Sequence, residues 1–88
     1  MSVLRDIGRC YRKLGDLDKA EDYLNDARRV VPADPWVLYE LALVAAESGD
    51  VDVAVELLES ALEVWVDADP EFRYAREARE KLAELRNR

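Results

Sequence analysis

The chain has 88 residues, of which 13 are basic and 20 are acidic, so its net charge is −7 at neutral pH. This length gives one small domain, near the lower limit at which a chain buries a core of its own. The negative charge argues against general attraction to DNA, RNA or anionic lipid. The first residues lack the apolar core of a signal peptide, and we therefore expect a soluble, cytoplasmic protein.

Nearly the whole chain has the apolar periodicity of amphipathic helices. Gly15 and Gly49, each followed by aspartate, predict turns between helices. A capping box from Asp18 to Glu21 predicts the start of the second helix, and Asp52 predicts the start of the fourth. The predicted helices span residues 2–14, 18–31, 35–48, 52–66 and 70–86.

The predicted third helix, 35–48, differs from the others because it is apolar on nearly every side. Between Trp36 and Ala46 it carries one charged residue, Glu40, and Asp34 is placed to cap its N-terminus. A helix that is apolar all round must be enclosed by other elements, and about four turns are too short to cross a bilayer. We therefore expect this helix to form the centre of the fold.

Cys10 is the one cysteine of the chain, so no internal disulfide can form. Its helical spacing from Tyr11 and Leu14 predicts a half-buried packing residue. A reactive thiol is the weaker alternative.

The sequence superimposes on itself when it is shifted by 34 residues. Both Gly-Asp turns coincide, large residues fall on large ones, and small residues fall where two helices must approach closely. A helix–turn–helix repeat of this period cannot bury its apolar face alone and stacks on its neighbour. The matched pairs are Leu4 with Leu38, Ile7 with Leu41, Gly8 with Ala42, Ala20 with Ala54, Leu24 with Leu58, and Ala27 with Ala61.

This pattern resembles the tetratricopeptide repeat (TPR) family over residues 1–68. The resemblance implies an all-α fold of two antiparallel helix–turn–helix repeats, 1–34 and 35–68, stacked as a short right-handed solenoid within one domain. Ala45 in place of an aromatic and Val66 in place of a proline make the second copy the weaker one. The residues that carry the resemblance in the first copy are Leu4, Ile7, Gly8, Tyr11, Ala20, Leu24, Ala27 and Pro32.

Residues 69–88 predict a C-terminal capping helix that closes the stack. The fourth helix has apolar residues at Val55 and Leu62 where the second helix has charged ones, so we expect the cap to dock there. Trp65 is predicted to pack beneath it, and an exposed dimer patch along Val55, Leu62 and Val66 is the alternative. The apolar stripe of the cap consists of Phe72, Ala75, Ala78, Leu82 and Leu85.

The resemblance also implies a function, because TPR-like stacks hold extended peptides in a concave groove lined by the first helix of each repeat. We expect the apolar Trp36, Tyr39 and Leu43 on the open side of that groove. One TPR subclass binds the terminal carboxylate of heat-shock chaperones, but Glu40 stands where that clamp has a neutral amide, and its charge argues against this ligand. The candidate groove residues are Arg5, Asp6, Arg9, Arg12, Lys13, Trp36, Tyr39, Glu40, Leu43, Glu47, Arg73 and Tyr74.

Catalytic and metal-binding chemistry is not indicated by the sequence. The chain has no histidine, one cysteine and no Gly-rich phosphate loop, so the common nucleophile–base pairs and metal sites cannot be assembled. Asp16 and Asp18 have the spacing of a calcium loop but lack its remaining ligands, and they fit helix capping better. The row of Glu56, Glu59 and Glu63 indicates a solvated face. We expect a protein that is not an enzyme and needs no cofactor.

Three functional hypotheses remain, and the charge distribution bears on each. The leading one is an interaction module for a protein or peptide that carries an acidic segment. The second is a structural repeat that self-associates head to tail or belongs to a longer array, because the first helix is basic and residues 35–68 contain eight acidic and no basic residues. The third, RNA binding by the basic row from Arg5 to Lys13, is disfavoured by the net charge. We expect a monomer or a weak homo-oligomer without affinity for nucleic acid or membrane.

Overall fold

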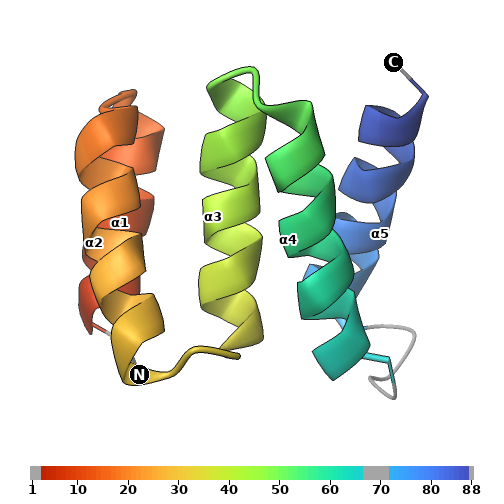
Figure 1. The fold of residues 1–88 in the computed structure, drawn as a ribbon, viewed down its shortest axis with the longest axis horizontal. Coiled ribbons are helices and arrows are strands. Elements are labelled where there is room, and N and C mark those ends of the chain that lie inside the picture. Colours follow the sequence, from red (N-terminus) through yellow and green to blue (C-terminus); the bar gives the residue numbers. More distant parts are fainter. Residues whose placement is uncertain (1–2, 67–71, 88) are drawn as a thin grey trace.

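The computed structural model describes residues 3–66 and 72–87, and every element within these ranges is a helix (Figure 1). The helices follow one another across the molecule in chain order, with α1 and α2 at one end and α5 at the other. The predicted all-α fold is therefore confirmed. The helices are α1 (Val3–Leu14), α2 (Leu17–Val30), α3 (Pro35–Glu47), α4 (Val51–Val64) and α5 (Arg73–Arg86).

The helices form two hairpins and a closing helix. α1 packs against α2, α3 packs against α4, α2 joins the two hairpins through α3, and α5 packs against α4. This stacking of one hairpin on the next makes the fold solenoid-like. The predicted start of the last helix near residue 70 lies outside the described residues.

The two Gly-Asp turns have the backbone that the sequence predicts. Gly15 has a φ of +85° and Gly49 has a φ of +87°, a left-handed conformation that is costly for residues with a Cβ atom. Each glycine therefore ends one helix and reverses the chain into the next.

The aspartates that cap the second and fourth helices are not the predicted ones. The Asp16 carboxylate accepts a hydrogen bond from the backbone N–H of Lys19 at 3.2 Å. Asp50 caps the fourth helix in the same way, so the prediction of Asp18 and Asp52 as caps is wrong. Both helices begin one residue earlier than expected, which places Asp18 and Asp52 inside the first turn, where they still favour the positive end of the helix dipole.

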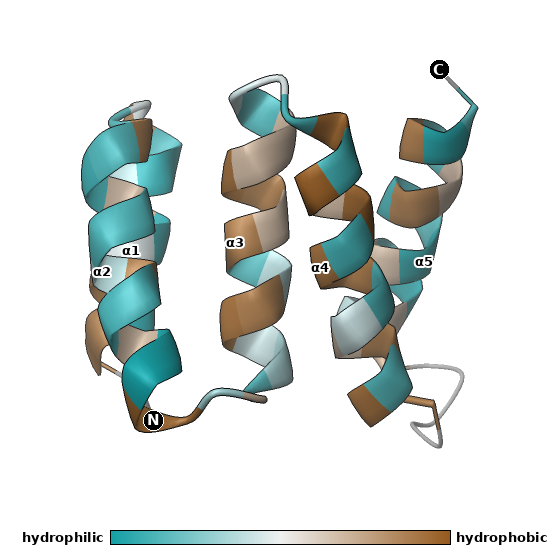
Figure 2. Cartoon of the chain, viewed as in Figure 1, coloured by the Kyte–Doolittle hydropathy of each residue, from teal (hydrophilic) through white to brown (hydrophobic). Residues whose placement is uncertain are grey.

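Buried apolar residues enclose α3 on two sides, and Figure 2 shows hydrophobic residues along much of this helix. Toward α2 it contributes Val37, Leu41 and Val44 to a cluster that also contains Leu24. Toward α4 and α5 it contributes Leu38, Tyr39 and Ala42 to a second cluster. The prediction that α3 forms the centre of the fold is confirmed.

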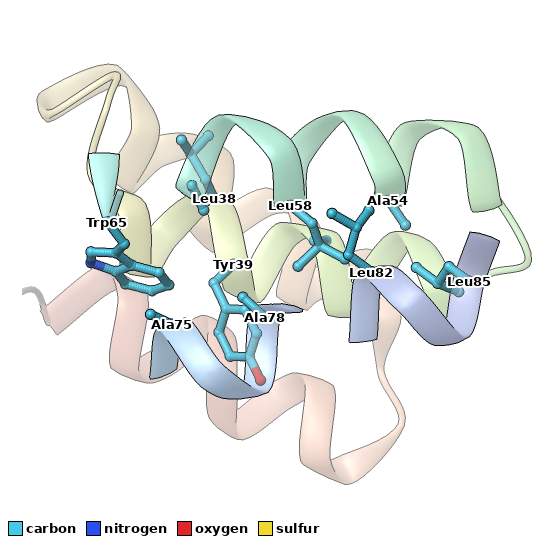
Figure 3. Close-up of a cluster of buried hydrophobic side chains, with 11 residues drawn as sticks. Leu38, Tyr39, Ala54, Leu58, Trp65, Ala75, Ala78, Leu82 and Leu85 are labelled. Atoms are coloured by element: carbon cyan, nitrogen blue, oxygen red, sulfur yellow. The ribbon is translucent and has the colours of Figure 1, made fainter. Parts of the chain in front are cut away.

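Trp65 lies beneath α5, as predicted. It is 6% exposed, and its ring centroid is 5.4 Å from that of Phe72 in an edge-to-face arrangement. Figure 3 shows Trp65 and Tyr39 beside the small residues Ala75 and Ala78 of α5, which allow the close approach. Among the residues of the alternative dimer patch, Val55 and Leu62 pack against this cluster, and only Val66 is exposed.

The apolar face of α1 is divided between the interior and the solvent. Leu4 and Tyr11 pack against the cluster between α2 and α3, whereas Val3 and Leu14 are exposed. Cys10 is also exposed, so the prediction of a half-buried packing cysteine is wrong. The reason is geometric, because α2 and α3 cover one side of α1 and no described element covers the side that carries Cys10.

Candidate functional site

A hollow of about 350 Å³ lies between α1, α3 and α5. These are the first helices of the two hairpins and the closing helix. The hollow therefore brings together two arginines, two aromatic residues and one carboxylate from all three parts of the chain. Its lining residues, all among the predicted groove residues, are Arg5, Arg9, Trp36, Glu40 and Tyr74.

Glu40 forms the floor of this hollow and is 6% exposed. The Nε atom of Arg12 donates a hydrogen bond to its Oε2 atom at 3.0 Å, and the Nε atom of Arg9 lies 3.9 Å from its Oε1 atom. Arg12 also donates to Glu47, with 3.2 Å between Nη1 and Oε1. Most of the charge on Glu40 is therefore balanced within the protein, and these ion pairs join α1 to α3.

Arg5 and Trp36 form one wall of the hollow. The guanidinium carbon of Arg5 lies 5.7 Å from the centre of the Trp36 ring, within the range of a cation–π contact. Arg5 also lies beside Asp6, with 3.5 Å between its Nη2 atom and the carboxylate Oδ1 atom. This wall therefore places the apolar ring of Trp36 directly beside the positive charge of Arg5.

Trp36 also belongs to an aromatic cluster that holds α5 in place. Its ring centroid is 5.7 Å from that of Trp65, 6.1 Å from that of Phe72 and 6.4 Å from that of Tyr74, each in an edge-to-face arrangement. Such pairs each add about 0.5–1.5 kcal/mol beyond the burial of their area. Trp36 and Tyr74 thus support the fold and line the hollow at the same time.

Tyr39 differs from the expectation that it lies on the open side of α3. It is 7% exposed, and its hydroxyl donates a hydrogen bond to the Oε2 atom of Glu77 at 3.4 Å. Burial raises its pKa from 10.0 to about 12, and the charges of Glu77 and Glu40 add to this rise while Arg12 opposes it. Because α5 covers this part of α3, Tyr39 packs in the core and supports Tyr74, whose ring centroid is 6.3 Å away.

Glu77 is the residue of this region that sequence reasoning missed as a partner of α3. Its helical spacing from Arg73 indicates an ion pair, and the two side chains are 3.2 Å apart. The link from Glu77 to Tyr39 spans 38 residues and arises only when α5 packs across α3, so no local pattern reveals it.

The remaining predicted groove residues lie outside the lining of the hollow. Lys13 is exposed, and Leu43 is half-buried against the core cluster rather than open. Arg73 is exposed, with its guanidinium carbon 5.4 Å from the centre of the Tyr74 ring. Leu43 therefore contributes to packing, whereas Arg73 extends the positive charge to the rim beside Tyr74.

Comparison with protein families agrees with this architecture. One family model, described as tetratricopeptide repeat, matches residues 2–44, and a second with the same description matches residues 39–87. The chain belongs to the tetratricopeptide repeat family. The second TPR match extends beyond residue 68 and includes α5, so the closing helix belongs to the TPR pattern as well. A comparison with curated proteins found no match.

Membership of the TPR family gives the function in general terms. TPR repeats mediate protein–protein interaction or assembly and are typically not enzymes. Within residues 3–66 and 72–87, no three histidine, cysteine or acidic side chains are grouped so that they could hold a metal ion. None of the described helices has the length and apolar character needed to cross a membrane.

Proposed function

We propose that this chain is a protein-binding module that holds a short peptide segment in the hollow between α1, α3 and α5. An acidic side chain of the peptide binds Arg5 and Arg9, and a neighbouring apolar side chain packs against Trp36 and Tyr74. The observation that carries this proposal is the juxtaposition of two arginines and two aromatic residues around one hollow of about 350 Å³.

The ion pairs beneath the hollow favour an anionic ligand over a cationic one. Glu40 is the single carboxylate in the lining, and its closest partner is Arg12 at 3.0 Å. A cationic ligand would compete with Arg12 for this carboxylate. An anionic ligand instead approaches Arg5 and Arg9, and the side chain of Arg9 is 41% exposed. Such charge contacts mainly raise the association rate and the specificity, and they weaken with salt.

The same ion pairs argue against head-to-tail assembly as the main role. That alternative requires the basic row of α1 to attract the acidic second repeat of another copy. Arg12 already pairs with Glu40 and Glu47 of its own chain, and Arg9 lies 3.9 Å from Glu40. The positive charge on α1 is thus partly neutralised within the molecule before any second copy approaches.

The test uses fluorescein-labelled octapeptides that contain an Asp-Glu pair next to a phenylalanine, with matched peptides in which Asn-Gln replaces the acidic pair. We expect the acidic peptides to bind more tightly, and Arg9→Glu to weaken their binding by about tenfold, because it replaces attraction with repulsion at the ligand carboxylate. Fluorescence anisotropy measures both affinities, at low and at physiological salt.

The matched control is Arg79→Glu, the same charge change at an exposed residue of α5 outside the hollow. Circular dichroism verifies that both variants fold. Trp36→Ala is a poor test, because it also removes the edge contacts to Trp65 and Phe72. If acidic and neutral peptides bind equally, or if Arg9→Glu and Arg79→Glu have equal effects, the proposed site is wrong.

A further inference from the structure

The outer side of α1 carries an apolar row that no described element covers. Val3 is 70% exposed and Leu14 is 79% exposed, Cys10 is exposed, and Ile7 is half-buried. Val3, Ile7, Cys10 and Leu14 line a shallow hollow of about 420 Å³ together with Asp6 and Tyr11. This face is distinct from the hollow of the proposed peptide site, which Arg5 and Arg9 line from another side of the helix.

The repeat shows what kind of surface this is. A shift of 34 residues carries Val3, Ile7 and Cys10 onto Val37, Leu41 and Val44 of α3. These three residues are buried, and they pack in one cluster with Ala20, Leu24 and Ala27 of α2. In the second hairpin this face is therefore the one on which another helix docks. The equivalent face of α1 has the same apolar character and spacing, and it is open.

The two ends of the stack differ in this respect. At the far end the outward residues of α5 are mostly charged, and they include Arg76, Arg79 and Glu80. A polar outer face of this kind is what keeps the end of a repeat stack soluble. The α1 end has an exposed apolar row instead, which is typical of a surface that binds a partner.

The pattern on α1 is self-complementary. The apolar row has spacings of four, three and four residues, so it reads the same in both directions along the helix. Asp6 and Lys13 are seven residues apart and hence lie on the same edge of this row, about 10 Å from each other. Lys13 forms no ion pair with any residue in the ranges 3–66 and 72–87, whereas Asp6 lies 3.5 Å from Arg5 and its side chain is 49% exposed.

We propose that the outer face of α1 binds the same face of a second copy of the chain, with the two helices antiparallel about a twofold axis. Val3 then packs near Leu14 of the other copy and Ile7 near Cys10, because these positions exchange when the row is reversed. In antiparallel helix pairs each edge meets the same edge of the partner. Asp6 of each copy therefore faces Lys13 of the other, which gives two equivalent ion pairs.

The dimer is weak by this geometry. α1 has 12 residues. One face of so short a helix buries less area than a standard stable interface, which buries about 1,200–2,000 Å² in total. We expect a dissociation constant on the order of 10 µM to 1 mM.

The first test is sedimentation equilibrium over this concentration range, with a reducing agent present so that Cys10 cannot form a disulfide between copies. Leu14→Ser removes an apolar group that does not contribute to the core, and we expect it to weaken dimerisation by about tenfold or more. Val66→Ser is the matched control, because Val66 is also an exposed apolar residue near a helix C-terminus but lies outside the face of α1. It is expected to leave the dimer unchanged.

The second test reverses the charges one at a time. Asp6→Lys places two lysines on each edge and Lys13→Asp places two aspartates there, so each variant alone should dimerise about 5 to 30 times more weakly. Mixing the two variants restores opposite charges in both pairs, and we expect a heterodimer at least as stable as the wild-type dimer. Because both variants must be folded to form it, this result cannot come from a folding defect.

Three results would overturn the proposal. The first is that the wild-type chain is a monomer over the whole concentration range. The second is that Leu14→Ser has no larger effect on dimerisation than Val66→Ser. The third is that the mixture of Asp6→Lys and Lys13→Asp associates no better than either variant alone. In the first case the apolar face of α1 does not bind a second copy of the chain. The result for Leu14→Ser is independent of the peptide site, because Arg9→Glu and Leu14→Ser alter different faces of α1.

Discussion

Gly8 marks the closest approach between α1 and α2, and its replacement tests the packing of the first hairpin. A Cβ atom at this position would lie 2.6 Å from Cγ and 2.9 Å from Cδ2 of Leu24, and 3.3 Å from the backbone oxygen of Ala20. Leu24 and Ala20 are both fully buried, so neither has open space to move into. Gly8→Ala is therefore expected to force α1 and α2 apart.

Two opposing effects decide the size of the change. Alanine stabilises a helix interior by about 0.8–1.0 kcal/mol relative to glycine. Overpacking a filled core costs about 1–3 kcal/mol, and the overlap with the branch atom of a buried leucine puts this case in the upper part of that range. We expect a net loss of about 1–2 kcal/mol in the free energy of unfolding, or roughly 4–16 °C in melting temperature for a domain of this size.

Urea unfolding followed by circular dichroism measures this change, and a double mutant assigns it to Leu24. Leu24→Ala alone should cost about 2–5 kcal/mol, because it leaves a cavity. In the double variant the new Cβ atom of residue 8 occupies part of that cavity. The double variant should therefore lose less free energy of unfolding than the sum of the losses of the two single variants. Strict additivity, or a Gly8→Ala variant as stable as the wild type, would refute the reasoning.

The second repeat supplies the control. Ala42 occupies the position equivalent to Gly8 and is fully buried in the hairpin of α3 and α4. Ala42→Gly should destabilise the protein by about 1 kcal/mol through helix propensity, and the lost burial of the methyl group adds to this cost. If Gly8→Ala and Ala42→Gly both destabilise the protein, the two helices approach more closely in the first hairpin than in the second.

Two further predictions concern Tyr39 and α5. Because the pKa of Tyr39 is raised from 10.0 to about 12 by burial, the folded state holds its proton more tightly than the unfolded chain. The resulting stability is complete below pH 10 and lost as the pH rises through 12, by up to about 3 kcal/mol. Ultraviolet titration and urea unfolding at pH 9 and 11, compared with Tyr39→Phe, check this, and a single transition near pH 10 for all tyrosines would contradict it. Removal of residues 67–88 uncovers Trp65 and Tyr39 and removes the buried Leu82 and Leu85. At about 1.5–3 kcal/mol for each apolar side chain, the loss is comparable with the whole stability of such a domain, so sharp amide spectra from residues 1–66 would contradict the role of α5.

The helices and their order could be predicted from the sequence because the repeat supplies the same information twice. The positions of the two turns could be predicted because both glycines occupy backbone conformations that other residues avoid. The caps were misplaced because Asp16 and Asp18 both suit the start of a helix, as do Asp50 and Asp52. Which aspartate caps the helix depends on the residue at which the helix begins after the glycine turn. The sequence does not give that residue to within one position.

The environment of the candidate site was harder to predict because it depends on contacts between distant parts of the chain. The sequence places Tyr39 on the same side of α3 as Trp36 and Glu40, and that grouping suggests an open groove. The packing of α5 across α3 buries Tyr39 and gives it Glu77 as a partner. The charge pattern likewise suggests a basic helix facing solvent, whereas Arg12 pairs with two acidic residues of α3.

The ion pairs between α1 and α3 reconcile an acidic protein with the proposed site for an acidic ligand. Eight acidic and no basic residues in the range 35–68 would repel an anion if their charge were unopposed. Glu40, the one carboxylate in the lining of the hollow, is paired with Arg12, and Arg12 also pairs with Glu47. The lining of the hollow contains two arginines and one carboxylate, and that carboxylate is already ion-paired. Because Tyr74 of α5 completes this lining and packs on Trp36, a ligand bound there contacts all three helices and favours the docked position of α5.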